Sequence, residues 1–155
     1  MPEFETTFRF AYPAEAVWQF VSWTGVERLA GSGAFTGASF KDRDPAPGAV
    51  RYTHLADGSR IEERLSLHAT DRLYYEYVIP DGSTLPIRGY RGIVEVTPVS
   101  AHESTLRLAH DCEPVSSGRA EWREAWLKME NAVADFIARQ LAGSASSHVE
   151  LSQGT

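Results

Sequence analysis

The sequence predicts an α+β domain in which one antiparallel sheet of seven strands wraps around a long C-terminal helix. Three observations lead to this fold class. Residues 119–141 carry apolar side chains at steps of three and four, which is the spacing of one helix face. Seven segments upstream have the composition and alternation of strands, and short turns separate the last six, which implies antiparallel pairing. A helix with a heavy aromatic stripe needs a broad apolar partner, and a curved sheet supplies one.

The long helix is expected to run from Arg119 to about Leu141. Its apolar stripe consists of Trp122, Trp126, Met129, Val133, Phe136, Ile137 and Leu141. The same spacing assigns the opposite side to Arg123, Glu124, Lys128, Glu130 and Asp135. Residues 1–142 are predicted to form a single domain, and the polar, Ser-rich residues 143–155 are predicted to be a largely disordered tail.

The N-terminal part predicts one strand followed by two short helical segments. Phenylalanine and threonine alternate with charged residues over residues 3–10, which is typical of a half-buried strand. Pro13 suits the first position of a helix because its missing N–H costs nothing there, and a short helix is expected over residues 14–22. A second helical turn is expected at residues 25–30, and residues 35–40 predict an edge strand.

The middle of the chain predicts five further strands. Residues 49–56 and 59–68 form the clearest pair, joined at Asp57-Gly58, which is a strong hairpin signal. The remaining strands are expected over residues 71–79, 89–97 and 104–112.

Hairpin geometry predicts which side chains face the helix. A two-residue turn at Asp57-Gly58 pairs His54 with Ile61 and Tyr52 with Glu63, and residues directly opposite share a face. This puts Tyr52, His54 and Glu63 on the apolar inner face. A slip of one residue would instead bury three arginines, a costly arrangement, and is therefore disfavoured. These arginines are Arg51, Arg60 and Arg64.

The same alternation predicts the rest of an inner surface. Tyr75 and Tyr77 point inward from one strand, Tyr90 from the next and His110 from the last, while Trp122 and Trp126 face them from the helix. A purely structural core rarely holds so many polar side-chain ends, because each needs a partner when it is buried. We therefore expect a hollow that is wet or filled by a ligand, between the sheet and the long helix.

Composition excludes some classes of function. A formal net charge of −6 argues against nucleic acid as a partner, and no apolar run reaches the length of a membrane span. The single cysteine, Cys112, permits no internal disulfide, and the N-terminus lacks the pattern of a signal peptide, so a cytoplasmic location is expected. Both a monomer and a homodimer are compatible with the sequence.

Several short motifs, in their order and spacing, resemble one superfamily. They lie at residues 13–18, 48–51, 63–65, 75–79, 85–90 and 94–98. Over residues 3–141 the chain is similar to the START-like, birch-pollen-allergen-like helix-grip superfamily (SRPBCC), and within it to the polyketide cyclase/dehydratase branch. The resemblance implies a cavity for a hydrophobic or aromatic ligand. It implies no single reaction, because members include cyclases as well as lipid and hormone carriers.

Three functions follow as hypotheses. In the first, the protein is an enzyme of the cyclase/dehydratase type that moves protons with Glu63 and His54, without a cofactor, while Tyr52, Tyr75, Tyr77 and Tyr90 orient the ligand. The alternative for the Glu63–His54 pair is that the two side chains merely satisfy one another. In the second, the protein carries or senses a hydrophobic ligand without catalysis. In the third, it is an interaction module like chaperone activators. No metal is expected, since only Glu63, His54 and His110 are candidate ligands.

Overall fold

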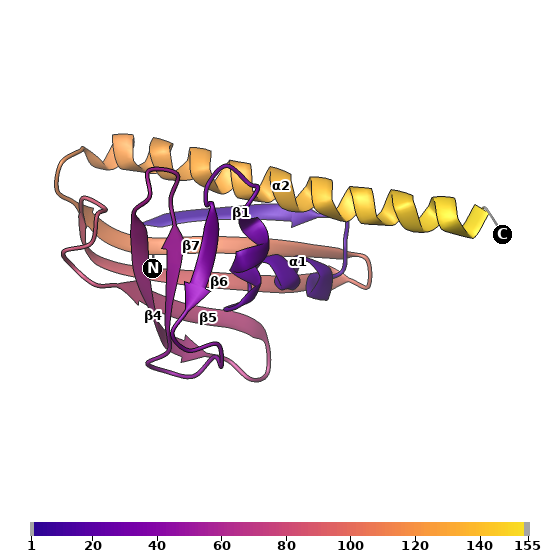
Figure 1. Ribbon diagram of the computed structural model, residues 1–155, viewed down its shortest axis with the longest axis horizontal. Helices are drawn as coiled ribbons and strands as arrows, with labels where there is room; N and C mark the ends of the chain where they lie inside the picture. Colours follow the sequence, from indigo (N-terminus) through magenta and orange to yellow (C-terminus); the bar gives the residue numbers. More distant parts are fainter. Residues whose placement is uncertain (1, 154–155) are drawn as a thin grey trace.

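One seven-stranded antiparallel sheet wraps against the long helix α2 in the computed structural model, which describes the backbone of residues 2–153 and the side chains of residues 2–144 (Figure 1). The strands follow the spatial order β1-β7-β6-β5-β4-β3-β2. Their bounds are Phe4–Phe10 (β1), Gly37–Phe40 (β2), Val50–His54 (β3), Arg60–His68 (β4), Leu73–Ile79 (β5), Ile87–Ser100 (β6) and Glu103–Pro114 (β7). Each predicted strand is present, and each pairs antiparallel with its neighbours.

Two short helical elements, α1 (Ala14–Val21) and the 3-10 helix η1 (Gly25–Leu29), connect β1 to β2 as expected. They pack against the sheet and α2, so that Val17 of α1 and Ile137 of α2 are completely buried in the same cluster as Leu106 of β7. Trp23, in the link between α1 and η1, is buried there as well, and its indole N–H donates to the carbonyl oxygen of Asp42. This cluster closes one end of the space between sheet and helix.

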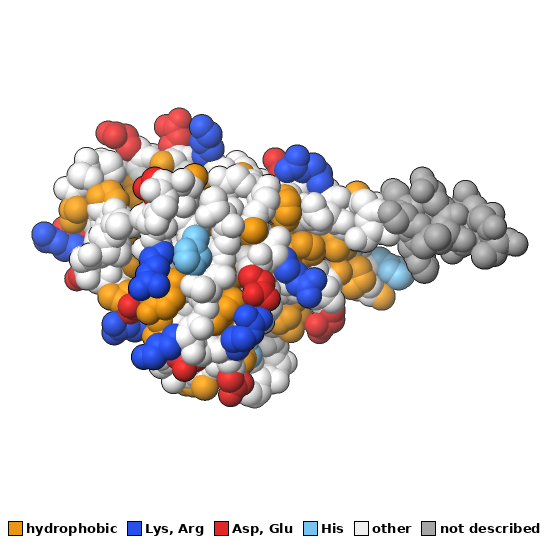
Figure 2. Space-filling model, in the orientation of Figure 1, with side chains coloured by type: hydrophobic (Ala, Val, Ile, Leu, Met, Phe, Trp, Pro, Cys, Tyr) orange, Lys and Arg blue, Asp and Glu red, His pale blue; other side chains and the backbone are white. Residues whose placement is uncertain are grey.

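The helix α2 (Arg119–Gln153) begins where the sequence predicts but continues past the predicted end at Leu141. Residues 143–153, expected to belong to a disordered tail, are helical, and residues 154–155 lie outside the described part. A glycine inside a helix costs only about 1 kcal/mol relative to alanine, so Gly143 does not by itself end α2. Figure 1 shows α2 running along the sheet and past its end. Neither α2 nor any other described helix carries an apolar stretch sufficient for a membrane span. Figure 2 shows one face of the molecule, on which basic and acidic side chains are scattered among apolar ones.

The β3–β4 hairpin differs from the prediction by one residue. The backbone N–H of Leu55 donates to the carbonyl oxygen of Ser59, so the turn contains three residues, and its Gly58 adopts a positive φ of 87°. Thr53 consequently lies opposite Ile61, and Arg51 lies opposite Glu63.

Because side chains alternate along a strand, this shift reverses the faces of β3. Arg51 and Thr53 point toward α2 and are buried, at 3% exposure each. Tyr52 and His54 lie on the outer face, and their predicted inward orientation is wrong. The inward orientation predicted for Glu63 of β4, Tyr75 of β5, Tyr90 of β6 and His110 of β7 is confirmed by their burial.

Candidate functional site

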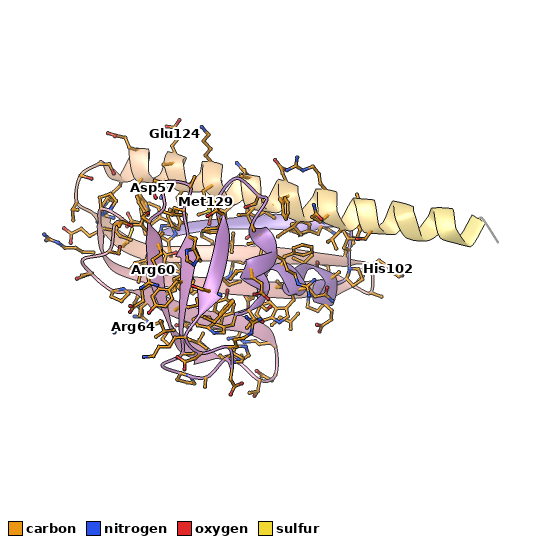
Figure 3. All side chains as sticks on the ribbon, in the orientation of Figure 1. Asp57, Arg60, Arg64, His102, Glu124 and Met129 are labelled. Carbon is orange, nitrogen blue, oxygen red and sulfur yellow. The ribbon has the colours of Figure 1, made fainter. Side chains whose placement is uncertain are left out.

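A partly open cavity of about 90 Å³ lies between the inner face of the sheet and α2. Most of its wall is aliphatic or aromatic, as in typical small-molecule sites, with a few polar groups converging on the space. Those polar residues are Arg51, Thr53, Glu63, Tyr75, Tyr77, Tyr90, His110 and Glu130. Figure 3 shows Met129, another lining residue, directed from α2 toward the sheet, whereas Glu124 points away from it.

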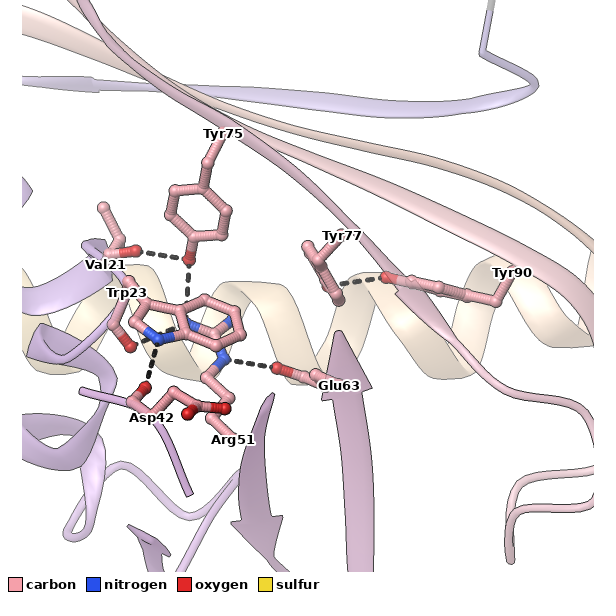
Figure 4. Close-up of polar contacts among 8 residues, drawn as sticks. All are labelled: Val21, Trp23, Asp42, Arg51, Glu63, Tyr75, Tyr77 and Tyr90. Carbon is pink, nitrogen blue, oxygen red and sulfur yellow. Dashed lines mark hydrogen bonds and ion pairs between the residues drawn. The ribbon is translucent and has the colours of Figure 1, made fainter. Parts of the chain in front are cut away.

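At one end of the cavity, Arg51 is held by a dense set of contacts (Figure 4). Its Nε donates to Glu63 Oε1 over 2.7 Å, and its Nη1 donates to the carbonyl oxygen of Trp23 over 2.9 Å and to the Tyr75 hydroxyl over 3.2 Å. The guanidinium carbon lies 4.4 Å from the Trp23 ring centroid. Burial opposes the charge on Arg51, but Tyr75 and Glu63 outweigh it and raise the pKa of the guanidinium above its usual range.

These contacts explain why the expected exposure of Arg51 is wrong. The cost of burying an arginine applies to an unpaired charge, whereas Arg51 has a carboxylate opposite it on the neighbouring strand. Tyr75 completes the set because its hydroxyl donates to the carbonyl oxygen of Val21 over 2.6 Å. The cluster therefore ties β3, β4 and β5 to the segment that follows α1.

His54 and Glu63, the predicted acid–base pair, lie on opposite faces of the sheet. The His54 Nε2 atom is hydrogen-bonded to the Ser39 hydroxyl over 2.9 Å on the outer side. Tyr52 is also outside, under the guanidinium of Arg60 at 4.1 Å from the ring centroid. The cavity thus keeps Glu63 of the predicted pair and excludes His54.

Tyr77 and Tyr90 form a second polar group on the cavity wall. Their hydroxyl oxygens are 2.8 Å apart and hydrogen-bonded. Burial raises the pKa of both phenols, so each stays neutral. One hydroxyl proton forms the bond between the two oxygens, and the other can be donated to a ligand. Thr53 adds a buried hydroxyl with no hydrogen-bond partner among the described residues. These oxygens can receive the polar end of a bound molecule.

Gly92 of β6 has no side chain and therefore leaves room for the Tyr77 ring, which gives a testable prediction. A Cβ at Gly92 would lie 2.5 Å from Tyr77 Cε1 and 2.6 Å from its Cζ. Gly92→Ala is expected to displace the ring, break the Tyr77–Tyr90 hydrogen bond and lower the free energy of unfolding by about 1–3 kcal/mol. Chemical denaturation measures this loss.

Gly37→Ala is the matched control for this substitution, because a Cβ at Gly37 meets nothing within 4 Å and its φ is not positive. We expect this variant to be as stable as the wild type or slightly more stable. Equal stability of the two alanine variants would contradict the assigned role of Gly92.

His110 sits in a box of aromatic rings. Its ring stacks on Phe4 and Tyr90 at centroid distances of 4.7 and 5.1 Å, and Trp126 lies 5.2 Å away. The indole N–H of Trp122 donates to His110 Nε2 over 2.9 Å. Burial lowers the pKa of His110 to about 4, so the imidazole is neutral near pH 7, and its proton resides on Nδ1 because Nε2 accepts.

Glu130 of α2 is, like Arg51 and Thr53, a cavity residue that the sequence interpretation missed. It was assigned to the solvent side of the helix, yet it is only 5% exposed and lines the cavity. Thr6 of β1 donates a hydrogen bond to its Oε1 over 3.1 Å. Burial raises the pKa of the Glu130 carboxyl to about 7, against a smaller opposing effect of the Thr6 hydrogen bond.

Helical spacing contains the signal that would have identified Glu130. It follows Trp126 by four positions and precedes Val133 by three, which places it inside the apolar stripe. Its charge alone led to the opposite assignment. Among the described residues, no three metal-ligating side chains converge on one point, in the cavity or elsewhere.

Comparison with known proteins gives one family match. The family model described as "Polyketide cyclase / dehydrase and lipid transport" matches residues 1–147. A search of curated proteins finds no match.

Solved structures share the fold at low sequence identity. The protein XoxI from Bacillus cereus is 19% identical with a TM-score of 0.75, over 90% of this chain and 95% of its own. An uncharacterized protein from Bacillus thuringiensis is 19% identical with a TM-score of 0.73, over 88% of this chain and 96% of its own. Norcoclaurine synthase from Thalictrum flavum, solved in complex with dopamine and hydroxybenzaldehyde, is 17% identical with a TM-score of 0.64, over 90% of this chain and 85% of its own.

The family match extends over nearly the whole domain, and the solved structures align with 88–90% of the chain at TM-scores of 0.64–0.75. The chain therefore belongs to the polyketide cyclase / dehydrase and lipid transport family and has the helix-grip fold of the SRPBCC superfamily.

Proposed function

We propose that the protein binds a small aromatic molecule in the cavity between the sheet and α2. The observation that carries this proposal is the partly open, mainly apolar cavity on which several buried polar groups converge. Such a combination is typical of ligand sites. In a closed core it would be unfavourable, because unfilled space and unpaired polar groups both reduce stability.

The volume of the cavity favours a ligand with a single ring. An engineered cavity of roughly 150 Å³ holds benzene, and the present space is about 90 Å³. Entry of an aromatic ring therefore requires a lining side chain to move. Met129 is suited to this because its unbranched side chain changes conformation easily. The norcoclaurine synthase structure supports the same ligand class by analogy of fold, since it holds two small aromatic compounds.

An acid–base enzyme of the cyclase/dehydratase type is the second candidate. It is favoured by a buried carboxyl, Glu130, whose pKa of about 7 suits proton transfer near neutral pH. The Tyr77–Tyr90 pair would stabilise an oxygen that gains negative charge. A non-catalytic carrier would need the same cavity but no proton transfer. An interaction module would need a filled core, so the presence of the cavity argues against it.

A titration with toluene that is monitored by two-dimensional NMR tests the binding proposal. We expect saturable shifts of signals from cavity residues, including the Met129 methyl group. Leu108→Trp, on the inner face of β7, is expected to fill the space and to abolish the shifts. Leu67→Trp is the matched control, because Leu67 lies at an exposed position of β4 and its replacement leaves the cavity unchanged.

Native mass spectrometry of the protein purified from its own host complements the titration. A retained small molecule, identified from the difference between native and denatured masses, would name the ligand class directly. Absence of toluene binding together with absence of a retained molecule would refute the proposed function and favour the interaction module.

A further inference from the structure

Building on the proposed function, we propose that the cavity selects small aromatic ligands that carry a basic amine, with the Glu130 carboxylate as the counter-ion, and that it rejects aromatic carboxylates. The inference depends on the charges that line the cavity and on which of them already have partners. The ionisable side chains capable of a charge near pH 7 are Arg51, Glu63 and Glu130.

The charge of Arg51 is already balanced by the Glu63 carboxylate. Its Nε and Nη1 atoms donate to Glu63, to the Trp23 carbonyl and to Tyr75, and the Trp23 ring covers its face. A ligand carboxylate at this end of the cavity would bring a second buried negative charge next to Glu63, and the single Arg51 guanidinium would not balance both. The Arg51–Glu63 pair thus contributes no net charge to the cavity.

Glu130, by contrast, lacks a cationic partner within 4 Å among the described side chains. Its recorded contact is the hydrogen bond from the neutral Thr6 hydroxyl. The nearest basic residue on the same helix face, Arg123, donates to the carbonyl oxygen of Glu3 over 3.3 Å and lies above the Phe4 ring at 5.2 Å. A ligand ammonium would supply the missing charge, and a buried carboxylate gains most from such a partner.

The other side chains around Glu130 in the main cavity are neutral or aromatic, which suits a cation. His110 is neutral, and its Nε2 already accepts from Trp122. Tyr90 and Trp126 line the cavity together with Glu130, and an ammonium close to the face of such an aromatic ring is attracted by it. His110, Trp126 and Glu130 also line a second pocket of about 110 Å³ between β1 and α2. An amine in either pocket can therefore reach the carboxylate.

Binding of an amine is expected to release a proton. Without a ligand, the buried Glu130 carboxyl is mostly protonated at about pH 6. A bound ammonium favours the carboxylate, so the carboxyl proton is released. The other titratable or charged groups around Glu130 are Glu5 of β1, Tyr90 of β6, His110 of β7, Arg123 of α2 and the Arg51–Glu63 pair. The carboxylate of Glu5 would also attract an ammonium, so a variant at position 130 is needed to assign the effect.

Three probes of matched size test the charge selection: benzylamine, benzyl alcohol and benzoate, titrated by calorimetry and NMR at about pH 7.5. For the wild type we expect benzylamine to bind at least about tenfold more tightly than benzyl alcohol and benzoate not to bind. Glu130→Gln should reduce benzylamine to the affinity of benzyl alcohol and leave benzyl alcohol unchanged. Glu124→Gln, on the exposed side of the same helix, should behave as the wild type.

Proton release provides an independent readout in the wild type. At about pH 6, titrations in buffers of different ionisation enthalpy should show release of up to one proton with benzylamine and none with benzyl alcohol. Equal affinities of the amine and the alcohol, preferential binding of benzoate, or unchanged benzylamine binding in Glu130→Gln would overturn the inference while leaving aromatic binding intact. Failure of all three probes to bind would overturn the proposed function as well.

Discussion

Replacing Arg51 with methionine is expected to lower the free energy of unfolding by about 3–5 kcal/mol. The substitution leaves the Glu63 carboxylate buried without a cation and removes the donors that satisfy the Trp23 carbonyl. Chemical denaturation at neutral pH measures the loss. The size of the effect follows from the burial of both partners, which are exposed by only 3% and 8% at their side chains.

Two further variants distinguish the loss of the Arg51–Glu63 ion pair from a general effect of removing an arginine. Arg51→Met combined with Glu63→Leu should recover most of the stability, because a buried ion pair can be replaced by apolar groups at little cost. Arg64→Met removes an arginine from the outer face of β4, where its partner Glu62 is also partly exposed, and should change stability by about 0–1 kcal/mol. If Arg51→Met and Arg64→Met cost the same, the buried pair does not stabilise the hairpin as argued.

Glu130→Gln is expected to be increasingly stabilising, relative to the wild type, as the pH rises from 4.5 to about 8. Below the usual glutamate pKa of 4.5 the carboxyl is protonated in both the folded and the unfolded state, so the variant has no electrostatic advantage. Between 4.5 and about 7 the folded state retains a proton that the unfolded state has lost, and the wild type loses stability. The shift corresponds to a difference of about 3 kcal/mol.

His110 has the opposite pH dependence and must be separated from Glu130. Burial lowers its pKa from 6.5 to about 4, so its contribution to stability is present above pH 6.5 and is lost as the pH falls toward 4. The two contributions oppose one another over most of this range, and the wild type alone should show a shallow pH profile. The difference between Glu130→Gln and the wild type, from denaturation curves at several pH values, isolates Glu130. A difference independent of pH would rule out a raised pKa.

Both substitutions address the same physical question, which is how the protein stabilises a charged side chain that is buried beside the cavity. Glu63 is stabilised by an ion pair with Arg51. Among the described side chains, the hydrogen-bond partner of Glu130 is instead the neutral hydroxyl of Thr6. A residue that reduces stability at neutral pH is often retained for function. This contrast is the reason for assigning ligand recognition to Glu130 and a structural role to the Arg51–Glu63 pair.

The sequence by itself determined the fold and most of the inner surface. The stripe from Trp122 to Ile137 predicts a helix that needs a sheet, and alternation predicts the inward faces of β5, β6 and β7. These predictions succeed because they depend on the local period of a helix or a strand. Tyr77, Tyr90 and His110 were placed in the cavity on that basis alone, and all three line it.

Only the tertiary structure decided the polar part of the site. One extra residue in the turn before Ser59 exchanges the two faces of β3, bringing Arg51 inward and taking His54 outward. Whether a buried arginine is tolerated depends on its neighbours across the sheet, and a single strand does not report them. For Glu130, helical spacing indicates the inward face, but only the tertiary structure shows that its partner is the neutral Thr6 hydroxyl of β1. Local periodicity specifies elements and faces, whereas the partners of buried charges are specified by contacts between distant segments.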